Sequence, residues 1–132
     1  MTSLIVIDTS VVVAVIKAEP EAQRLVEIMA ANPCRMSAFS VFEAESVIGK
    51  LGGPLAVPDV RKLLGAFRVE IVPFDDRLAV LATEARLRFG KGVHPARLNL
   101  GDCAAYALAV SLEVPLLYKG DDFALTDIVS AN

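Results

Sequence analysis

The feature that most constrains the fold is an alternation of short, β-rich apolar runs with longer segments of helical periodicity. Such runs suit strands buried on both faces, and strands that alternate with helices form a parallel sheet covered by helices. The sequence therefore predicts an α/β fold in a single domain over residues 1–132, with a central parallel sheet of four to five strands. The predicted strands are residues 3–7, 35–38, 69–72 and 114–118, and the predicted helices are residues 11–17, 21–31, a segment from 40 onward, 59–67, 75–89 and 101–112.

Composition narrows the class of protein. With 55% hydrophobic residues the chain is too apolar to be disordered, yet its apolar stretches are too short to cross a membrane. The N-terminus lacks the signals of a secretory leader, and the two cysteines lack metal-ligand spacing, so we expect a cytoplasmic protein. A net charge of −3 argues against a general nucleic-acid coat protein. Residues 85–101 nevertheless contain no acid, and they carry Arg86, Arg88, Lys91, His94 and Arg97.

Acidic residues stand at the ends of several predicted elements. Asp8 directly follows the first strand, and Asp121 and Asp122 follow the fourth. Glu43 and Asp102 lie where two of the predicted helices begin. Because ligands of open parallel sheets bind beyond the carboxyl ends of the strands, we expect four acidic positions to converge at this edge.

Each acid also has a purely structural explanation. Asp8 can cap the first helix, and Ser40 with Glu43 has the S-x-x-E form of a capping box. Asp102 can be the third residue of a helix capped by Asn99, and the final pair of acids suits a turn. The joint pattern is more specific than any of these positions alone.

Helical periodicity leaves one choice open in the helix that begins near residue 40. Glu43 and Glu45 border its apolar stripe on opposite sides, so the pattern does not choose between them. The residues of this predicted stripe are Val41, Ala44, Val47, Ile48 and Leu51.

Carboxylates that converge need a cation. Without one they repel each other and raise one another's pKa values. A set of carboxylates with no cluster of cysteine or histidine favours magnesium or manganese over zinc. Such an ion activates water and stabilises the leaving oxygen of a phosphodiester.

The order of these motifs resembles that of the PIN-domain ribonuclease toxins of the VapC family. The resemblance covers essentially the whole chain and implies a PIN-like α/β/α sandwich with an acidic pocket that binds Mg2+ or Mn2+. Four segments carry the resemblance, in the order VIDTSVVVAVI, SVFEAESVI, FGKGVHPARLNLGDCAAYALA and PLLYKGDDFALTDI. The third of them, with a basic loop before N-x-G-D-C, is the most specific.

The resemblance also implies roles for the acids. By position, Asp8, Glu43 and Asp102 match the first three acids of the family motif. Asp8 and Asp102 are then the direct metal ligands, and Glu43 completes the pocket directly, through water or at a second ion. Many relatives carry an acid two residues before the D-F pair, where this chain has glycine. The fourth acid is therefore Asp121 or Asp122.

The implied activity is that of an endoribonuclease toxin. RNA phosphodiester bonds would be hydrolysed by metal-activated water, which leaves 5′-phosphate and 3′-hydroxyl ends. The implied partners are a VapB-like antitoxin, whose C-terminal segment covers the acidic pocket, and a second copy of the toxin. The candidate substrate-binding residues are Thr9, Ser10, Arg86, Arg88, Lys91, Arg97 and Lys119.

Three alternative functions fit the sequence less well. A degenerate PIN domain that only binds RNA or protein is the main alternative, because of the glycine at the fourth acidic position. A phosphatase on a doubly wound sheet usually has a second aspartate two residues after the first, and this chain has Ser10 there. A dinucleotide-binding fold is disfavoured because no G-x-G-x-x-G follows the first strand.

Overall fold

A four-stranded parallel sheet forms the centre of the computed structural model, which describes residues 3–132. The strands are β1 (Ile5–Ile7), β2 (Cys34–Ser37), β3 (Glu70–Val72) and β4 (Leu116–Leu117), in the order β3-β2-β1-β4. The chain adds β2 and β3 on one side of β1 and then crosses to place β4 on the other side. This reversal of direction beside β1 is where open α/β sheets form their ligand crevice.

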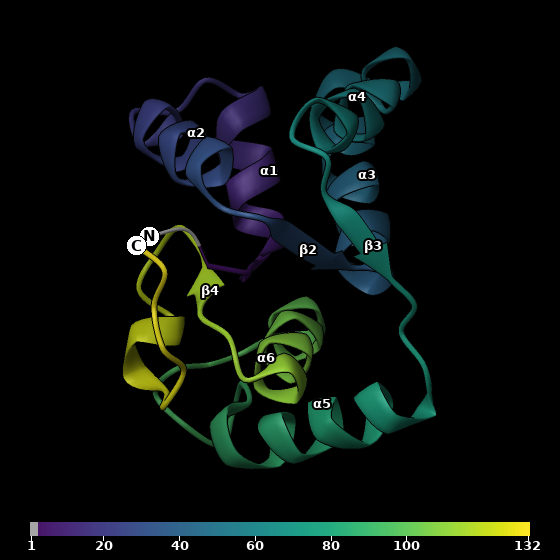
Figure 1. The fold of residues 1–132 in the computed structure, drawn as a ribbon. Helices are drawn as coiled ribbons and strands as arrows, with labels where there is room; N and C mark the ends of the chain where they lie inside the picture. The colour runs from purple at the N-terminus through teal and green to yellow at the C-terminus, as the bar shows by residue number, and fades with distance from the viewer. Residues whose placement is uncertain (1–2) are drawn as a thin grey trace.

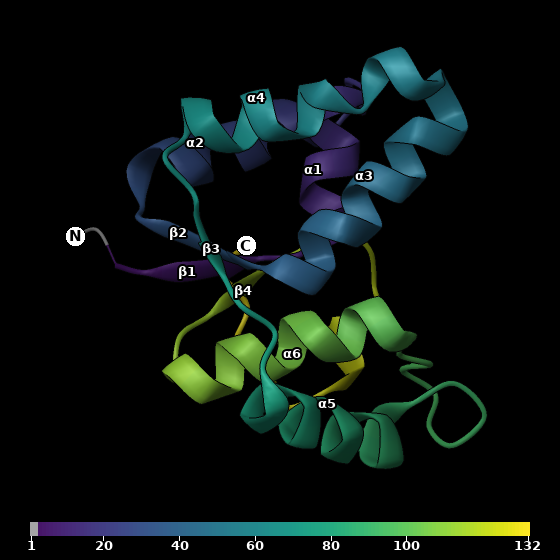
Figure 2. The ribbon, with the colours of Figure 1, turned by 90° about the vertical axis from the view of Figure 1, so that its right-hand side faces the viewer.

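Helices cover both faces of the sheet (Figures 1 and 2). One layer holds α1 (Thr9–Ile16), α2 (Ala22–Ala31), α3 (Ala38–Gly52) and α4 (Pro58–Ala66). The opposite layer holds α5 (Asp76–Phe89) and α6 (Leu100–Leu112). Two 3-10 turns, η1 (Pro54–Ala56) and η2 (Phe123–Leu125), complete the regular structure. The predicted α/β/α sandwich is confirmed.

Two apolar cores lie on either side of the sheet, and β1 contributes to both. Ile5 and Ile7 belong to the core beneath α1 to α4, whereas Val6 belongs to the core beneath α5 and α6. This division follows from the period of two along a strand, which sends successive side chains to opposite faces. It explains why the strand reads as an uninterrupted apolar run, as predicted.

The two helices of the second layer agree with their sequence patterns. In α6, Gly101 and all residues from 103 to 109 are buried, as expected for a helix that is apolar nearly all round. In α5 only one stripe is buried, through Leu78, Ala85 and Phe89. Among residues 3–132, no helix is both long enough and apolar enough to cross a membrane.

The start of α3 differs from the prediction. The helix begins at Ala38, and the hydroxyl of Ser37 caps it by accepting a hydrogen bond from Phe39 N. The expected capping box of Ser40 and Glu43 is therefore wrong, because strand β2 ends one residue early and the helix starts before Ser40. Glu43 consequently lies in the second turn of α3, where its side chain is free for other contacts.

The far end of α3 also departs from the predicted stripe. Val41, Ala44 and Ile48 are buried as expected, but the Leu51 side chain is 60% exposed. The helix ends one residue later, at Gly52, and Leu51 belongs to neither of the two apolar cores.

Candidate active site

Asp8 stands at the junction of β1 and α1, directly beyond the carboxyl end of the strand. Its backbone N–H donates to Leu117 O at 3.0 Å, which continues the pairing of β1 with β4. Its carboxylate oxygen Oδ2 accepts from Ser10 N at 3.0 Å, so Asp8 is the N-cap of α1 as well as a pocket residue. The residue is 3% exposed, and its second oxygen, Oδ1, is buried without a hydrogen-bond partner. An unpartnered buried carboxylate oxygen is costly and calls for a donor or a cation.

Burial and neighbouring negative charges raise the pKa values of two acids in the site. Burial, followed by the negative charge of Asp102, raises the pKa of Asp8 to about 7, and Glu43 adds to this while the hydrogen bonds of Ser10 oppose it. Burial raises the pKa of Asp102 to about 6, against the hydrogen bond from Asn99, and the charges of Glu43 and Asp122 raise it further. Asp8 after β1, Glu43 in α3 and Asp102 in α6 therefore share one electrostatic environment.

Glu43 is held by residues from two other elements. The Thr9 hydroxyl donates to Glu43 Oε1 at 2.6 Å and also lies 3.2 Å from the Ser40 carbonyl oxygen. On its other side the Glu43 carboxylate lies against Gly101, in the first turn of α6, where any other residue would have its β-carbon. The Thr9 hydroxyl thus binds Glu43, and Thr9 also lines the pocket, where its role in substrate binding stays a prediction.

Asp102 closes a capping box at the start of α6, as one reading of the sequence predicted. Asp102 N donates to Asn99 Oδ1 at 2.8 Å, and Asn99 N donates to Asp102 Oδ2 at 3.0 Å. This arrangement fixes the carboxylate of Asp102 at the sheet edge. The structural and the functional interpretation of this aspartate are therefore compatible.

These acids line one open pocket of about 310 Å³. Glu19 also lines it, and sequence reasoning missed this residue because it lies in the turn after α1 rather than at the end of a strand. Asp121 and Asp122 are exposed and are not among the lining residues, although the charge of Asp122 acts on Asp102. The lining residues are Asp8, Thr9, Ser10, Val13, Glu19, Glu43, Val47, Asn99, Asp102 and Lys119.

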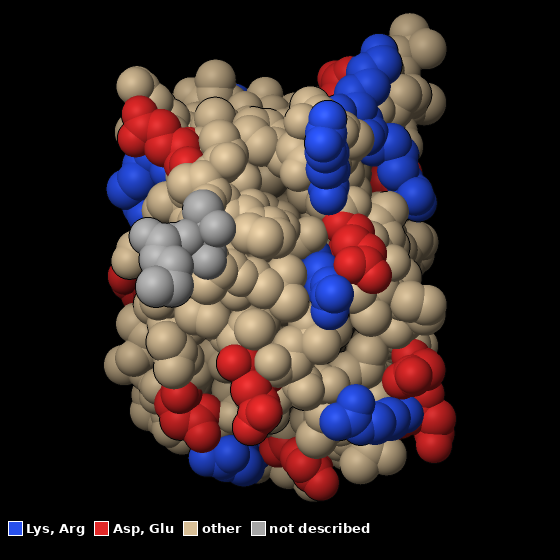
Figure 3. Space-filling model, viewed as in Figure 1, with Lys and Arg blue, Asp and Glu red and all other residues tan. Residues whose placement is uncertain are grey.

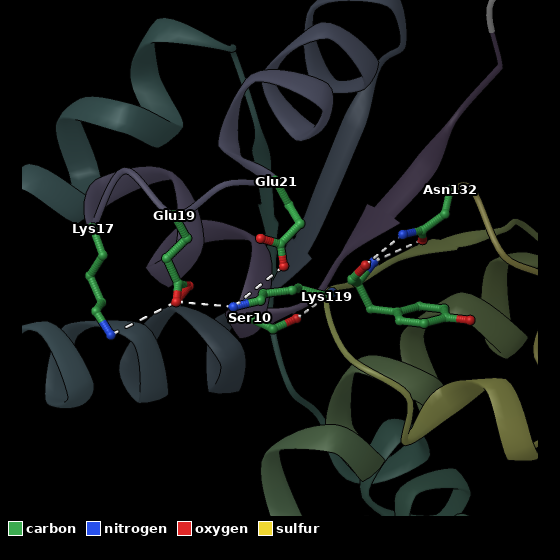
Figure 4. Close-up of polar contacts among 7 residues, drawn as sticks. Ser10, Lys17, Glu19, Glu21, Lys119 and Asn132 are labelled. Atoms are coloured by element: carbon green, nitrogen blue, oxygen red, sulfur yellow. Dashed lines mark hydrogen bonds and ion pairs between the residues drawn. The ribbon is translucent and has the colours of Figure 1, made fainter.

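Lys119 lies at the rim of this pocket, where acidic residues hold it (Figure 4). Its ammonium is 3.0 Å from Glu19 Oε2 and 3.5 Å from Glu21 Oε2, and its backbone N–H donates to Ser10 Oγ at 2.9 Å. These contacts tie the loop after β4 to the start of α1 and to the turn between α1 and α2. Glu19 and Glu21 also raise the pKa of Lys119, so its ammonium stays charged at neutral pH.

The other basic candidates differ in their surroundings. Arg88 pairs with Asp127 at 3.3 Å and lies over the ring of Phe89, which commits it to the packing of α5. The side chains of Arg86, Lys91 and Arg97 are exposed and form no ion pair within residues 3–132. On the face drawn in Figure 3, basic and acidic side chains are interspersed around a broad uncharged area, without a continuous basic band among the described residues.

The donors of the pocket suit a hard divalent cation. They are carboxylate and hydroxyl oxygens, which magnesium and manganese prefer, and Asp8 offers an oxygen that has no other partner. Within residues 3–132, no three acidic, histidine or cysteine side chains are close enough to share one ion as they stand. Glu43 is hydrogen-bonded to Thr9 and Asp102 to Asn99, so their carboxylates would have to turn, or bind through water, to surround an ion.

Comparisons with known proteins identify the family. The sequence matches the PIN domain over residues 5–129. It is 39% identical to ribonuclease VapC42 of Mycobacterium tuberculosis over 125 residues, which cover 93% of this chain and 95% of that protein. It is 41% identical to ribonuclease VapC of Mycolicibacterium smegmatis over 128 residues, or 96% of this chain and 99% of that protein.

Solved structures share the fold at lower sequence identity. Mycobacterium tuberculosis VapC20, described as a toxin that cleaves the sarcin–ricin loop, superposes with a TM-score of 0.78 at 18% identity, covering 95% of this chain and 96% of that one. VapBC2 of Rickettsia felis, bound to a DNA fragment from its promoter, gives a TM-score of 0.72 at 14% identity, covering 96% of each chain. With its fold, its converging acids and these relatives, the chain belongs to the PIN domain family, among the VapC ribonucleases.

Proposed function

We propose that this chain is a metal-dependent endoribonuclease that hydrolyses RNA phosphodiester bonds and acts as the toxin of a toxin–antitoxin pair. The observation that carries the proposal is the meeting of Asp8, Glu43 and Asp102 in one pocket. They come from the junction of β1 with α1, from α3 and from α6, and they lie beyond the carboxyl edge of the sheet, in a member of the VapC ribonucleases. No alternative nucleophile is needed, because hydrolysis of this kind uses water.

Each acid has its own role in binding a divalent ion. Asp8 and Asp102 are proposed as direct ligands, and Glu43 completes the pocket. When bound, Mg2+ or Mn2+ would activate water and offset the charge that develops on the phosphate oxygens. Asp8 holds a proton more readily than an ordinary aspartate because of its burial, and it must lose that proton to bind a cation. Asp122, whose charge reaches Asp102, is proposed as the fourth acid in preference to Asp121.

The partners follow from the family. A VapB-like antitoxin is proposed to cover the acidic pocket with a C-terminal segment, and similar folds include a toxin–antitoxin complex from Klebsiella pneumoniae. The RNA is proposed to enter as an unpaired loop, where bases can be splayed away from the backbone. A toxin homodimer and a cytoplasmic location stay predictions.

An RNA cleavage assay with controlled metal content tests the proposal. We expect purified protein, free of any antitoxin, to cut RNA in Mg2+ or Mn2+ and to leave 5′-phosphate ends, with no cutting in EDTA. Asp8→Asn should abolish the cutting, and Asp59→Asn is its matched control, since it removes one carboxylate from the exposed first turn of α4. Intact RNA from folded protein across a panel of loops would favour the binding scaffold, and cutting that survives EDTA would contradict the metal mechanism.

The basic residues give a separate prediction about substrate binding. Arg86 lies in the last turn of α5 and Arg97 in the loop that leads into α6, and neither has an ionic partner within the described residues. We expect Arg86→Gln and Arg97→Gln each to reduce the slope of log affinity against log salt concentration by about 0.7, as for one lost phosphate contact on a single strand. Binding of an RNA loop to the inactive Asp8→Asn protein measures this slope.

A matched arginine on another face provides the control for the salt dependence. Arg61 of α4 is paired with Glu45, away from the pocket, so Arg61→Gln is expected to leave the slope unchanged. An equal loss of slope in all three variants would mean that net charge, rather than this loop, attracts the RNA.

A further inference from the structure

Gly101 occupies the second position of α6, immediately before Asp102, and it is buried. If this residue had a β-carbon, the three heavy atoms nearest to it would all belong to the Glu43 carboxylate, and they would overlap it. The end of the Glu43 side chain therefore fills the space that any other residue at position 101 would need. A side chain from α3 approaches the backbone of α6 more closely here than a β-carbon would permit.

The glycine has no other explanation in the local structure. Its φ angle lies outside the positive range, in which only Gly53, Gly92 and Gly120 are found among the glycines. Within a helix, glycine is less favourable than alanine, so its presence costs stability unless it serves a contact. Gly65 in α4 is different, because a β-carbon there would meet nothing within 4 Å.

Glu43 is confined on its opposite side by Thr9. The hydroxyl of Thr9 donates to Glu43 Oε1 at 2.6 Å, and Thr9 itself is buried. The carboxylate thus lies between a hydrogen-bond donor from α1 and the bare backbone of α6. Glu43 and Asp102 line the same pocket from these positions.

We infer that Gly101 is a positioning residue, whose missing side chain lets the Glu43 carboxylate lie against the first turn of α6, between Thr9 and Asp102. The inference rests on the proposed nuclease function and assigns to Gly101 the spacing between two of its acids. Gly101 touches neither RNA nor metal in this account and acts only through Glu43.

The variant Gly101→Ala separates this role from folding. The added methyl group meets the end of a long side chain rather than backbone, so Glu43 can turn away without movement of the backbone. The gain in helix propensity offsets the lost Thr9 hydrogen bond, and we expect the midpoint of thermal unfolding in EDTA to change by less than about 4 °C. Cleavage of RNA should fall about 100-fold, the loss that a misplacement of about 1 Å can cause.

Glu43→Asp supplies a compensating change. It shortens the side chain by one methylene group, which withdraws the carboxylate from the space that the methyl of Gly101→Ala would take. In the wild-type background this change should reduce activity by itself. In the Gly101→Ala background it should restore activity, so that the double variant is at least about 10-fold more active than the product of the two single effects predicts.

Metal binding provides a readout that does not depend on catalysis. The rise in unfolding midpoint on titration with Mn2+ should shift to higher concentration in Gly101→Ala and return toward the wild-type curve in the double variant. Gly65→Ala is the matched control, because it makes the same change in a helix where the space is open, and it should behave as the wild type in both assays.

Three results would overturn the inference. The first is unchanged RNA cleavage and an unchanged response to Mn2+ in Gly101→Ala. The second is a double variant whose loss of cleavage equals the combined losses of Gly101→Ala and Glu43→Asp, with no recovery. The third is an unfolding midpoint in EDTA more than about 10 °C below the wild type, which would make the glycine structural. Failure of the proposed function has a different signature, namely a folded wild type that cuts no RNA at all.

Discussion

Asp8→Asn is expected to reduce RNA cleavage by at least about 100-fold, because loss of even an outer partner of a metal ligand costs about 10–100-fold. The same change should stabilise the metal-free protein. Asp8 is buried, one of its oxygens has no partner, and the charges of Asp102 and Glu43 oppose its ionisation. An amide of the same shape removes that charge and offers a donor where an acceptor is unpartnered.

The expected gain can be put in energetic terms. A pKa raised from 3.8 to about 7 corresponds to a penalty of roughly 4 kcal/mol for the ionised form above pH 7. Asparagine must still be accommodated in a site built around a carboxylate, so we expect a gain of about 2–4 kcal/mol in the free energy of unfolding. Activity and stability would thus change in opposite directions, as expected where a functional site is kept at a cost to the fold.

Urea unfolding in EDTA at pH 7.5, beside the cleavage assay, measures both effects. Asp59→Asn, which changes an exposed carboxylate of α4, is the control for the loss of one negative charge. A variant of Asp8 that is both inactive and strongly destabilised would show that the carboxylate supports the fold, and would remove it as evidence for a metal ligand.

The metal-free protein is expected to lose stability as the pH rises from about 4 to about 7. The unfolded chain ionises Asp8 near its usual pKa of 3.8, whereas the folded protein does so near 7. Within this window the folded state binds the extra proton, so each step up in pH favours unfolding. The contribution of Asp8 is complete below pH 3.8 and has gone above pH 7, a change of roughly 4 kcal/mol at most.

Two other carboxyl groups also affect how stability depends on pH. Asp102, whose pKa is raised to about 6, has the same sign as Asp8, and the two titrate as an interacting pair. Asp127 has the opposite sign, because its hydrogen bond from Tyr106 lowers its pKa, and its effect is confined to more acidic conditions. The difference in the free energy of unfolding between wild type and Asp8→Asn therefore isolates the contribution of Asp8 between pH 4 and 7.

Urea titrations in EDTA at intervals of pH between 4.5 and 7.5 would measure this dependence. The wild type should become less stable with rising pH, the Asp8→Asn variant should show a flatter profile, and saturating Mg2+ should restore stability to the wild type at pH 7.5. A wild-type profile as flat as that of the variant would mean that Asp8 ionises normally in the folded protein.

Several features of this fold were predictable because they depend on local chemistry. The run ending at Ile7 could be assigned to a buried strand, since its side chains enter both cores, and Asp8 followed from its place after that strand. The prediction failed at the start of α3, where Ser37 and Ser40 are both plausible caps by sequence. Only the length of β2 in the sheet decides between them, and a capping pattern contains no information about it.

The sequence by itself determined the alternating strands and helices, and it placed acids at the predicted ends of four of them. The tertiary structure alone decided which acids meet. Glu43 and Glu45 were equivalent on the helix, yet Glu45 pairs with Arg61 of α4 while Glu43 contacts Thr9 and enters the pocket. Periodicity defines the side of a helix on which a residue lies, but the neighbour it meets there comes from distant parts of the chain. For the same reason, the attachment of Lys119 to Glu19 and the space left by Gly101 for Glu43 emerge only when the elements are packed together.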